Sequence, residues 1–172
     1  MIEGGEKAKK KRRHIVGLLV EDQPGVMAKI SGLFSRRGFN IDTLVVGKGM
    51  QEGVSHIVVS SIADDKTIEQ LEKQVSKLVD VFKVIDLNEK HSVVREHCLL
   101  KVSSTPKTRN DLVNTAKLHH AEVISMNSDS LIIEIIGTPE KIDNFLKLAK
   151  KYGVKEVSRT GINAMQRGNN KK

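Results

Sequence analysis

The sequence predicts an α+β protein of two small domains, each with the order strand, helix, strand, strand, helix, strand. Its 172 residues are enough for two domains of about 75 to 80 residues each. Short apolar runs typical of buried strands alternate with stretches in which apolar residues recur at the helical period. Helix start and stop signals and turn residues separate these segments. We therefore expect the same set of elements twice.

The first half contains one complete set. Its expected elements are a strand at 15–20, a helix with Val26, Ile30, Leu33 and Phe34 at helical spacing, strands at 41–46 and 54–62, a helix from Asp64 to near Asp80, and a strand at 82–87. The second helix carries the apolar positions Ile68, Leu71, Val75, Leu78 and Val79. Asp64 and Asp65 fall at its start, where carboxylates stabilise free N–H groups, so capping is favoured over catalysis there.

The second half repeats this order without obvious identity to the first. Its expected elements are a strand at 98–102, a helix around Leu112, strands at 121–126 and 131–136, a helix from Ile142 to Tyr152 ended by Gly153, and a strand at 154–157. Each half matches the ferredoxin-like βαββαβ unit. We place the domains at 14–90 and 95–168, joined near 89–95.

The net charge of +8 lies at the two ends of the chain. Residues 14–158 hold 19 basic and 19 acidic residues, which excludes a basic nucleic-acid groove in the folded part. Residues 1–13 are basic without an apolar segment behind them, so we expect a disordered tail and no secretory signal. A docking role for this tail stays open. Apolar runs fall short of the roughly 20 residues of a membrane span, and the single Cys98 fits a cytoplasmic setting.

The remaining motifs predict no catalytic residue and no metal site. His91, His97 and Cys98 lack the spacing of known ligand sets, and the neighbouring His119 and His120 cannot both face one metal from a regular element. Nucleophile, phosphate-loop and dinucleotide fingerprints are missing from the sequence. The central strands carry no aromatic side chain on which RNA bases would stack.

The loop from Val20 to Val26 is the strongest candidate site. Free N–H groups and the positive dipole end at the start of the helix suit a carboxylate, and Gly25 has no Cβ to block its approach. Asp22 offers an acceptor for an ammonium group, and the amide of Asn40 can donate and accept. The alternative is that Asp22 only caps the helix and Gly25 only forms the turn. From the residues alone, this alternative is slightly favoured.

These residues resemble an ACT domain, a small-ligand sensing module whose loop carries an acid or amide, one residue, Pro, Gly and an aliphatic residue. Longer motifs resemble the acetolactate (acetohydroxyacid) synthase small-subunit family. They are Leu33–Ile41, Ile68–Gln74, Lys77–Val79, Arg95–Glu96 and Arg167–Gly168. The resemblance covers about 14–168 and implies an N-terminal ACT domain followed by the family's C-terminal small-subunit domain.

The resemblance implies a non-catalytic regulatory subunit that activates a large catalytic subunit and makes it sensitive to valine. The chain itself would hold no cofactor, while thiamine diphosphate, Mg and FAD are expected in the catalytic partner. The family also implies a homodimer through the ACT domains. Asp22, Gly25 and Val26 of one chain would then face Asn40 and Ile41 of the other. The alternative function is a stand-alone ACT-domain sensor acting on another enzyme or on transcription.

Two positions depart from the family pattern. Asp22 stands where many members have Asn, and Ser55-His56 stands where the family often has Ser-Arg. By charge matching, we expect the ligand's ammonium group near Asp22 and its carboxylate at the helix start. The preferred branched-chain amino acid stays open, because one methylene in an apolar pocket is worth only about 1 to 3 kcal/mol.

Overall fold

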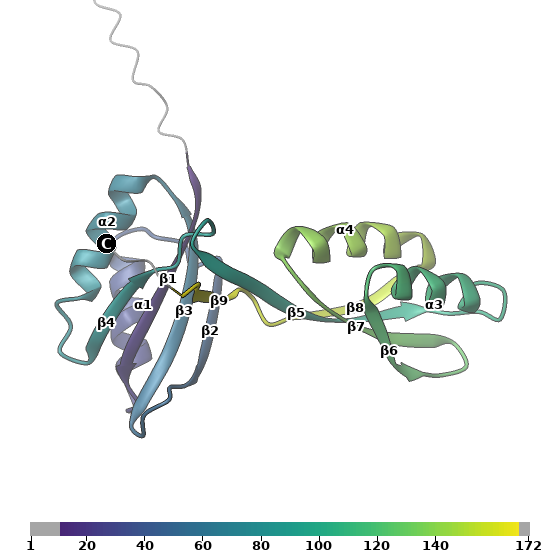
Figure 1. The fold of residues 1–172 in the computed structure, drawn as a ribbon, viewed down its shortest axis with the longest axis horizontal. Coiled ribbons are helices and arrows are strands. Elements are labelled where there is room, and N and C mark those ends of the chain that lie inside the picture. The colour runs from purple at the N-terminus through teal and green to yellow at the C-terminus, as the bar shows by residue number, and fades with distance from the viewer. Residues whose placement is uncertain (1–10, 169–172) are drawn as a thin grey trace, which may run out of the picture. The chain divides into compact units, whose positions relative to one another are not determined.

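The computed structural model describes residues 11–168 and contains two units with the same strand order (Figure 1). The described residues up to Ser92 and from Gln166 onward form the first unit, and Val93–Met165 form the second. Each unit has an antiparallel sheet and two helices, which confirms the predicted α+β, ferredoxin-like fold. In this part of the chain no helix is long and apolar enough to cross a bilayer.

The first unit has the sheet order β2-β3-β1-β4. Its elements are β1 (Arg12–Glu21), α1 (Val26–Arg36), β2 (Thr43–Lys48), β3 (Val54–Ala63), α2 (Asp65–Val75) and β4 (Val81–Asp86). Strand β1 runs antiparallel to β3, with Arg12 opposite Ala63 and Glu21 opposite Val54. Asp64 caps α2, as predicted, because its carboxylate accepts the Thr67 N–H at 3.1 Å.

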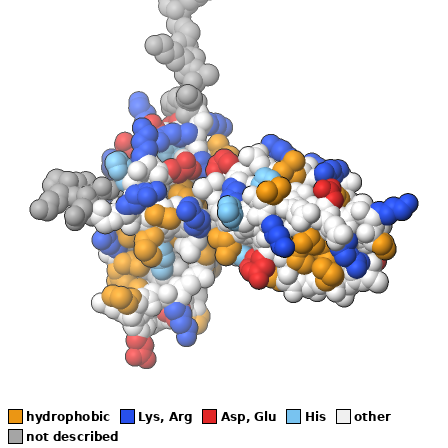
Figure 2. All heavy atoms as spheres, turned by 45° about the vertical axis from the view of Figure 1, so that its right-hand side comes forward, with side chains coloured by type: hydrophobic (Ala, Val, Ile, Leu, Met, Phe, Trp, Pro, Cys, Tyr) orange, Lys and Arg blue, Asp and Glu red, His pale blue; other side chains and the backbone are white. Residues whose placement is uncertain are grey.

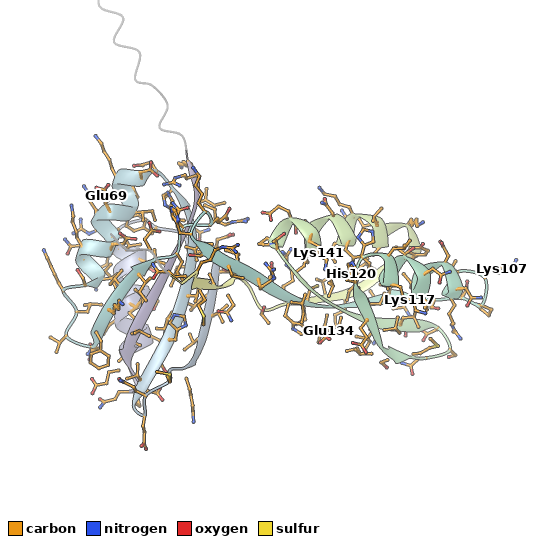
Figure 3. All side chains as sticks on the ribbon, in the orientation of Figure 1. Glu69, Lys107, Lys117, His120, Glu134 and Lys141 are labelled. Atoms are coloured by element: carbon orange, nitrogen blue, oxygen red, sulfur yellow. The ribbon has the colours of Figure 1, made fainter. Side chains whose placement is uncertain are left out.

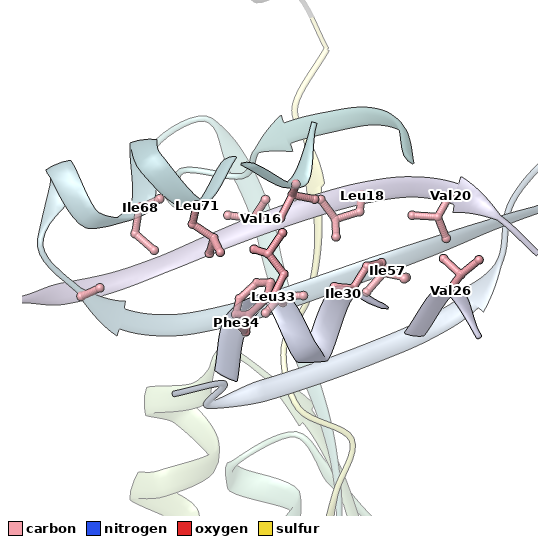
Figure 4. Close-up of a cluster of buried hydrophobic side chains, with 13 residues drawn as sticks. Val16, Leu18, Val20, Val26, Ile30, Leu33, Phe34, Ile57, Ile68 and Leu71 are labelled. Carbon is pink, nitrogen blue, oxygen red and sulfur yellow. The ribbon is translucent and has the colours of Figure 1, made fainter. Parts of the chain in front are cut away.

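Both helices pack on one face of this sheet (Figure 4). The core joins alternate positions of β1 and β3 to the apolar faces of α1 and α2, among them Val16, Leu18, Val20, Ile30, Phe34, Ile57, Ile68 and Leu71. Alternation in the strands and the helical period in the helices bring these side chains to one layer. The helix positions predicted from periodicity, up to and including Val75, are therefore buried.

Three predicted boundaries in the first unit are wrong. Strand β1 begins at Arg12, inside the predicted tail, because Arg12 and Arg13 continue its pairing with β3; residues 1–10 of that tail lie outside the described part. Strand β2 begins at Thr43, so Ile41 precedes it. Helix α2 ends at Val75 and Val79 is 94% exposed, since the chain turns there to enter β4 at Val81.

The second unit has the sheet order β6-β7-β5-β8, with β9 also paired to β5. Its elements are β5 (Ser92–Ser103), α3 (Arg109–Leu118), β6 (Ala121–Met126), β7 (Ser130–Gly137), α4 (Pro139–Ala149), the short 3-10 helix η1 (Lys150–Tyr152), β8 (Val154–Arg159) and β9 (Asn163–Gln166). Only the first residue of β5 and the last residue of β9 belong to the first unit. The sequence did not predict β9, which has only four residues. We also predicted a connection at 89–95, whereas β5 already begins at Ser92.

A buried carboxylate in the second unit is paired with a partly exposed arginine. Glu96 on β5 is 4% exposed, and both its carboxylate oxygens accept from Arg159 on β8, at 2.7 and 2.6 Å. Arg159 also donates to Asp143 on α4 at 2.7 Å. The hydrogen bonds from Arg159 to Glu96 raise the pKa of the guanidinium group. This bidentate arrangement ties β5, β8 and α4 together.

Glu72 on α2 supplies a test of the electrostatics in the first unit. Partial burial, and then the charges of Asp86 and Glu69, raise the pKa of Glu72. A raised carboxyl pKa means that the ionised form disfavours the folded state, and that this penalty disappears below the unfolded pKa. Glu72→Gln should therefore raise the midpoint of thermal unfolding at pH 7, and the gain should vanish near pH 4. An equal gain at both pH values would point to another cause.

Candidate functional site

The loop after β1 is held by the hairpin that joins β2 and β3. The N–H of Asp22 donates to the backbone oxygen of Gly53 at 2.8 Å. Ser55, at the start of β3, donates its hydroxyl to Oδ1 of Asp22 at 3.1 Å. Asp22 is otherwise exposed, so one face of its carboxylate stays open to a ligand. Ser55 was not predicted as a site residue, because a partner 33 positions away leaves no local sequence signal.

Helix α1 begins at this loop without a side-chain cap. Gly25 is its N-cap residue, with φ of 93°, a left-handed conformation that favours glycine. No side chain accepts from the first turn, so the interpretation of Asp22 as a helix cap is wrong. The Val26 N–H makes only a long contact of 3.4 Å to Gln23, and the next N–H groups have no acceptor within the helix. This end of α1 is therefore suited to a carboxylate.

Asn40 and Ile41 lie at the other end of β3. The backbone oxygen of Asn40 accepts from the Ser61 hydroxyl at 2.7 Å, and Ile41 packs against the core of the unit. Ser55 and Ser61 are six residues apart on β3, which corresponds to about 20 Å along an extended strand. One chain thus brings Asp22, Gly25 and Val26 together but keeps Asn40 and Ile41 away from them. A site that uses all five residues requires a second chain.

The second unit repeats the backbone frame of this loop. Ser104 follows β5 as Asp22 follows β1, and its N–H donates to Asp129 O at 2.8 Å, as the Asp22 N–H does to Gly53 O. In both units the register between the first and last strands shifts two residues before the first strand ends. The two loops therefore occupy equivalent places in their folds.

The chemistry of the second loop is different. Ser104 is 2% exposed and replaces the carboxylate, while Lys107 stands three positions later, where the first loop has Gly25. Arg109 closes this region by donating to the backbone oxygens of Asn127 and Ser128 at 3.0 and 2.8 Å. The loop itself has no acceptor carboxylate for an ammonium group. The first loop is therefore the candidate amino-acid site.

The described histidines lie apart from the Asp22 loop or in ordinary polar pairs. In the stretch 11–168, no three His, Cys, Asp or Glu side chains are grouped to hold a metal. His97 contacts Glu134 at 2.8 Å, and Glu134 lies on the sheet side away from α3 and α4 (Figure 3). Lys and Arg side chains are interspersed with acidic and polar ones on the visible face of each unit (Figure 2). These features indicate structural pairs and solvated surface.

The fold and the loop define a protein of the ACT class with a second ferredoxin-like unit. A family model described as an AHAS small subunit-like ACT domain matches residues 16–83, and the model for the small subunit of acetolactate synthase matches residues 95–168. The chain belongs to the acetolactate synthase small-subunit family.

Curated relatives and a solved structure agree with this assignment. The chain is 42% identical to a probable acetolactate synthase small subunit of Archaeoglobus fulgidus, over 92% of this chain and 99% of that protein. It is 40% identical to the acetolactate synthase small subunit of Mycolicibacterium smegmatis, over 90% and 91%. The crystal structure of the Thermotoga maritima small subunit has a TM-score of 0.85 and 41% identity, over 92% of this chain and 99% of that chain.

Proposed function

We propose that this chain is the regulatory subunit of an acetolactate synthase and confers feedback inhibition by valine on its catalytic partner. The observation that carries this proposal is the uncapped start of α1 beside the fixed carboxylate of Asp22. An amino acid has one anionic and one cationic group, and the loop offers a counterpart for each. The family assignment supplies the enzyme that responds.

The loop geometry suggests how valine would bind. Its carboxylate accepts from the free N–H groups in the first turn of α1, where the helix dipole also favours negative charge. Its ammonium group donates to Asp22, whose carboxylate is positioned by Ser55. Gly25 leaves open space, because a Cβ built there would have no heavy atom within 4 Å. The branched side chain is left to face the second chain.

The second chain would complete the site across a two-fold axis. Strand β2 is an edge of its sheet, and its outward Leu44 and Val46 are 37% and 49% exposed. An exposed apolar edge strand favours pairing with another chain. In a two-fold dimer each loop carrying Asp22 and Gly25 would meet Asn40 and Ile41 of the partner, which gives two equivalent sites.

Regulation then depends on differential binding. Valine inhibits if it binds better to the dimer arrangement in which the catalytic subunit is less active. This chain contributes binding and positioning only, and the reaction takes place in the catalytic subunit with that subunit's thiamine diphosphate, Mg and FAD. The role therefore needs no nucleophile or metal ligand in this chain.

Reconstitution tests the proposal. The cognate catalytic subunit should form acetolactate faster when the full chain is added, and valine should lower the rate only in the combined enzyme. The control is the catalytic subunit alone, which should be insensitive to valine. The proposal is wrong if the added chain changes neither the rate nor the valine sensitivity.

A further inference from the structure

A groove of about 450 Å³ lies between the C-terminal end of α1 and helix α2 of the first unit, at a distance from the Asp22 loop. It is lined by Arg37, Phe39, Thr67, Gln70, Leu71, Lys73 and Gln74. Its volume falls in the range of about 300 to 1,000 Å³ that is typical of small-molecule sites. Neither the family models nor the names of the relatives assign a ligand here.

The end of α1 fixes the first side of the groove. Gly38 has φ of 69°, its N–H donates to Ser35 O at 3.0 Å, and the Phe39 N–H donates to Phe34 O at 3.0 Å. This is the Schellman pattern, which is usually accompanied by an apolar contact across the turn. The rings of Phe34 and Phe39 make that contact, with centroids 6.2 Å apart. Arg37 and Phe39 are therefore presented on a rigid turn.

Four of the polar side chains around the groove have no partner among the described residues. Within the described residues, no hydrogen bond or ion pair is formed by the side chains of Arg37, Lys73, Gln70 or Gln74. Phe39 and the buried Leu71 supply the apolar part of the lining. Two cations, two amides and an apolar surface thus face one space.

The lining carries no carboxylate, and the acids of α2 face elsewhere. The charges of Asp86 and Glu69 act on Glu72, and none of these three acids lines the groove. Asp64 is occupied as the N-cap, since it accepts from both the N–H and the hydroxyl of Thr67. The side chains that α2 contributes to the groove are therefore a cation, amides, a hydroxyl and an apolar group, with no acid among them. The groove attracts an anion and offers an ammonium group no carboxylate as a counterion.

We infer that this groove binds a short aliphatic carboxylate that lacks an amino group, such as a branched 2-oxo acid. Arg37 and Lys73 would contact the carboxylate, the amides of Gln70 and Gln74 would donate to the oxo oxygen, and Phe39 and Leu71 would pack on the aliphatic chain. The Asp22 loop favours a ligand that has an amino group, because Asp22 accepts from an ammonium group. The first unit thus has separate sites for an amino acid and for its oxo analogue.

The test is an NMR titration of the full ¹⁵N-labelled chain with 3-methyl-2-oxobutanoate, which differs from valine only at the amino-bearing carbon. Saturable shifts are expected at Phe39, Gln70 and Gln74, with weaker binding of 3-methylbutanoate, which lacks the oxo group. Valine should not shift these signals. The inference is overturned if no saturable shift occurs up to roughly 20 mM, or if valine shifts the same signals with equal affinity.

Matched lysine variants on α2 provide the control. Lys73→Glu, in the groove, should weaken binding of the oxo acid at least tenfold, whereas Lys66→Glu, exposed on the same helix, should leave it unchanged. Gln74→Glu adds a carboxylate without changing shape and should also weaken binding at least tenfold. Equal losses in the Lys66 and Lys73 variants would show a general charge effect and contradict the inference. The readout does not involve valine inhibition, so it fails or succeeds independently of the proposed function.

Discussion

Gly25→Asp should abolish valine inhibition of the reconstituted enzyme and leave its activation in place. The new carboxylate would lie beside the start of α1, where the ligand carboxylate is expected. Two charges about 4 Å apart repel by about 4 kcal/mol at an effective dielectric constant of 20. We expect valine affinity to fall roughly a hundredfold or more, which a titration of acetolactate formation against valine concentration measures.

Gly25→Asn is the matched control. Asparagine and aspartate have nearly the same shape, and both meet the same backbone strain at the φ of 93° that Gly25 adopts. The two variants therefore share any backbone strain and differ in charge. The enzyme with Gly25→Asn should still be clearly inhibited by valine, although less strongly than the enzyme with the native chain. Equal inhibition in the two variants would place the ligand carboxylate elsewhere.

Arg159→Met should destabilise the second unit by about 2 kcal/mol, because it leaves the buried carboxylate of Glu96 without its partner. Glu96 is 4% exposed and the side chain of Arg159 is 31% exposed, so water can replace only part of the hydrogen bonds that the guanidinium group makes. Methionine keeps the apolar stem of the arginine, which limits the loss of packing. Urea unfolding of the full chain, followed at the buried Cys98 by its reactivity toward a thiol reagent, measures the change.

Lys155→Met supplies the comparison on the same strand. Lys155 pairs with Asp129 at 2.6 Å, but the side chains are 38% and 70% exposed. Exposed pairs contribute about 0 to 1 kcal/mol, so this variant should unfold almost as the native chain does. Similar losses in the two variants would show that burial of Glu96 is not the cause.

Local patterns in the sequence predict most of the fold. The helical spacing of Ile30, Leu33, Ile68 and Leu71 identifies the buried faces of α1 and α2, and all four are buried. Asp64 could be predicted as an N-cap, because an acid just before a segment of helical periodicity is a local sequence signal. The predictions that were wrong concern features that depend on partners distant in the sequence. Val79 follows the period of α2 but lies in the turn to β4, and β9 is a strand only through its pairing with β5.

Part of the candidate site could likewise be predicted from local sequence patterns, and part could not. Gly25 and Asp22 stand out because a helix start, a glycine and an acid lie within a few residues. The sequence leaves open whether Asp22 caps the helix, and that question depends on Ser55, which no local pattern connects to the loop. The separation of Asn40 from Asp22 follows from the register of β3 with its neighbours. A shared site rests on that separation together with the family resemblance.

Mixed dimers test most directly whether two chains share each valine site. One chain carries Gly25→Asp and the other Asn40→Leu, and neither homodimer should bind valine. If the sites are shared, one of the two sites in the purified mixed dimer carries both substitutions and the other site carries neither. Calorimetry should then find one valine per mixed dimer. No binding by the mixed dimer would mean that each site lies within a single chain and would contradict the account.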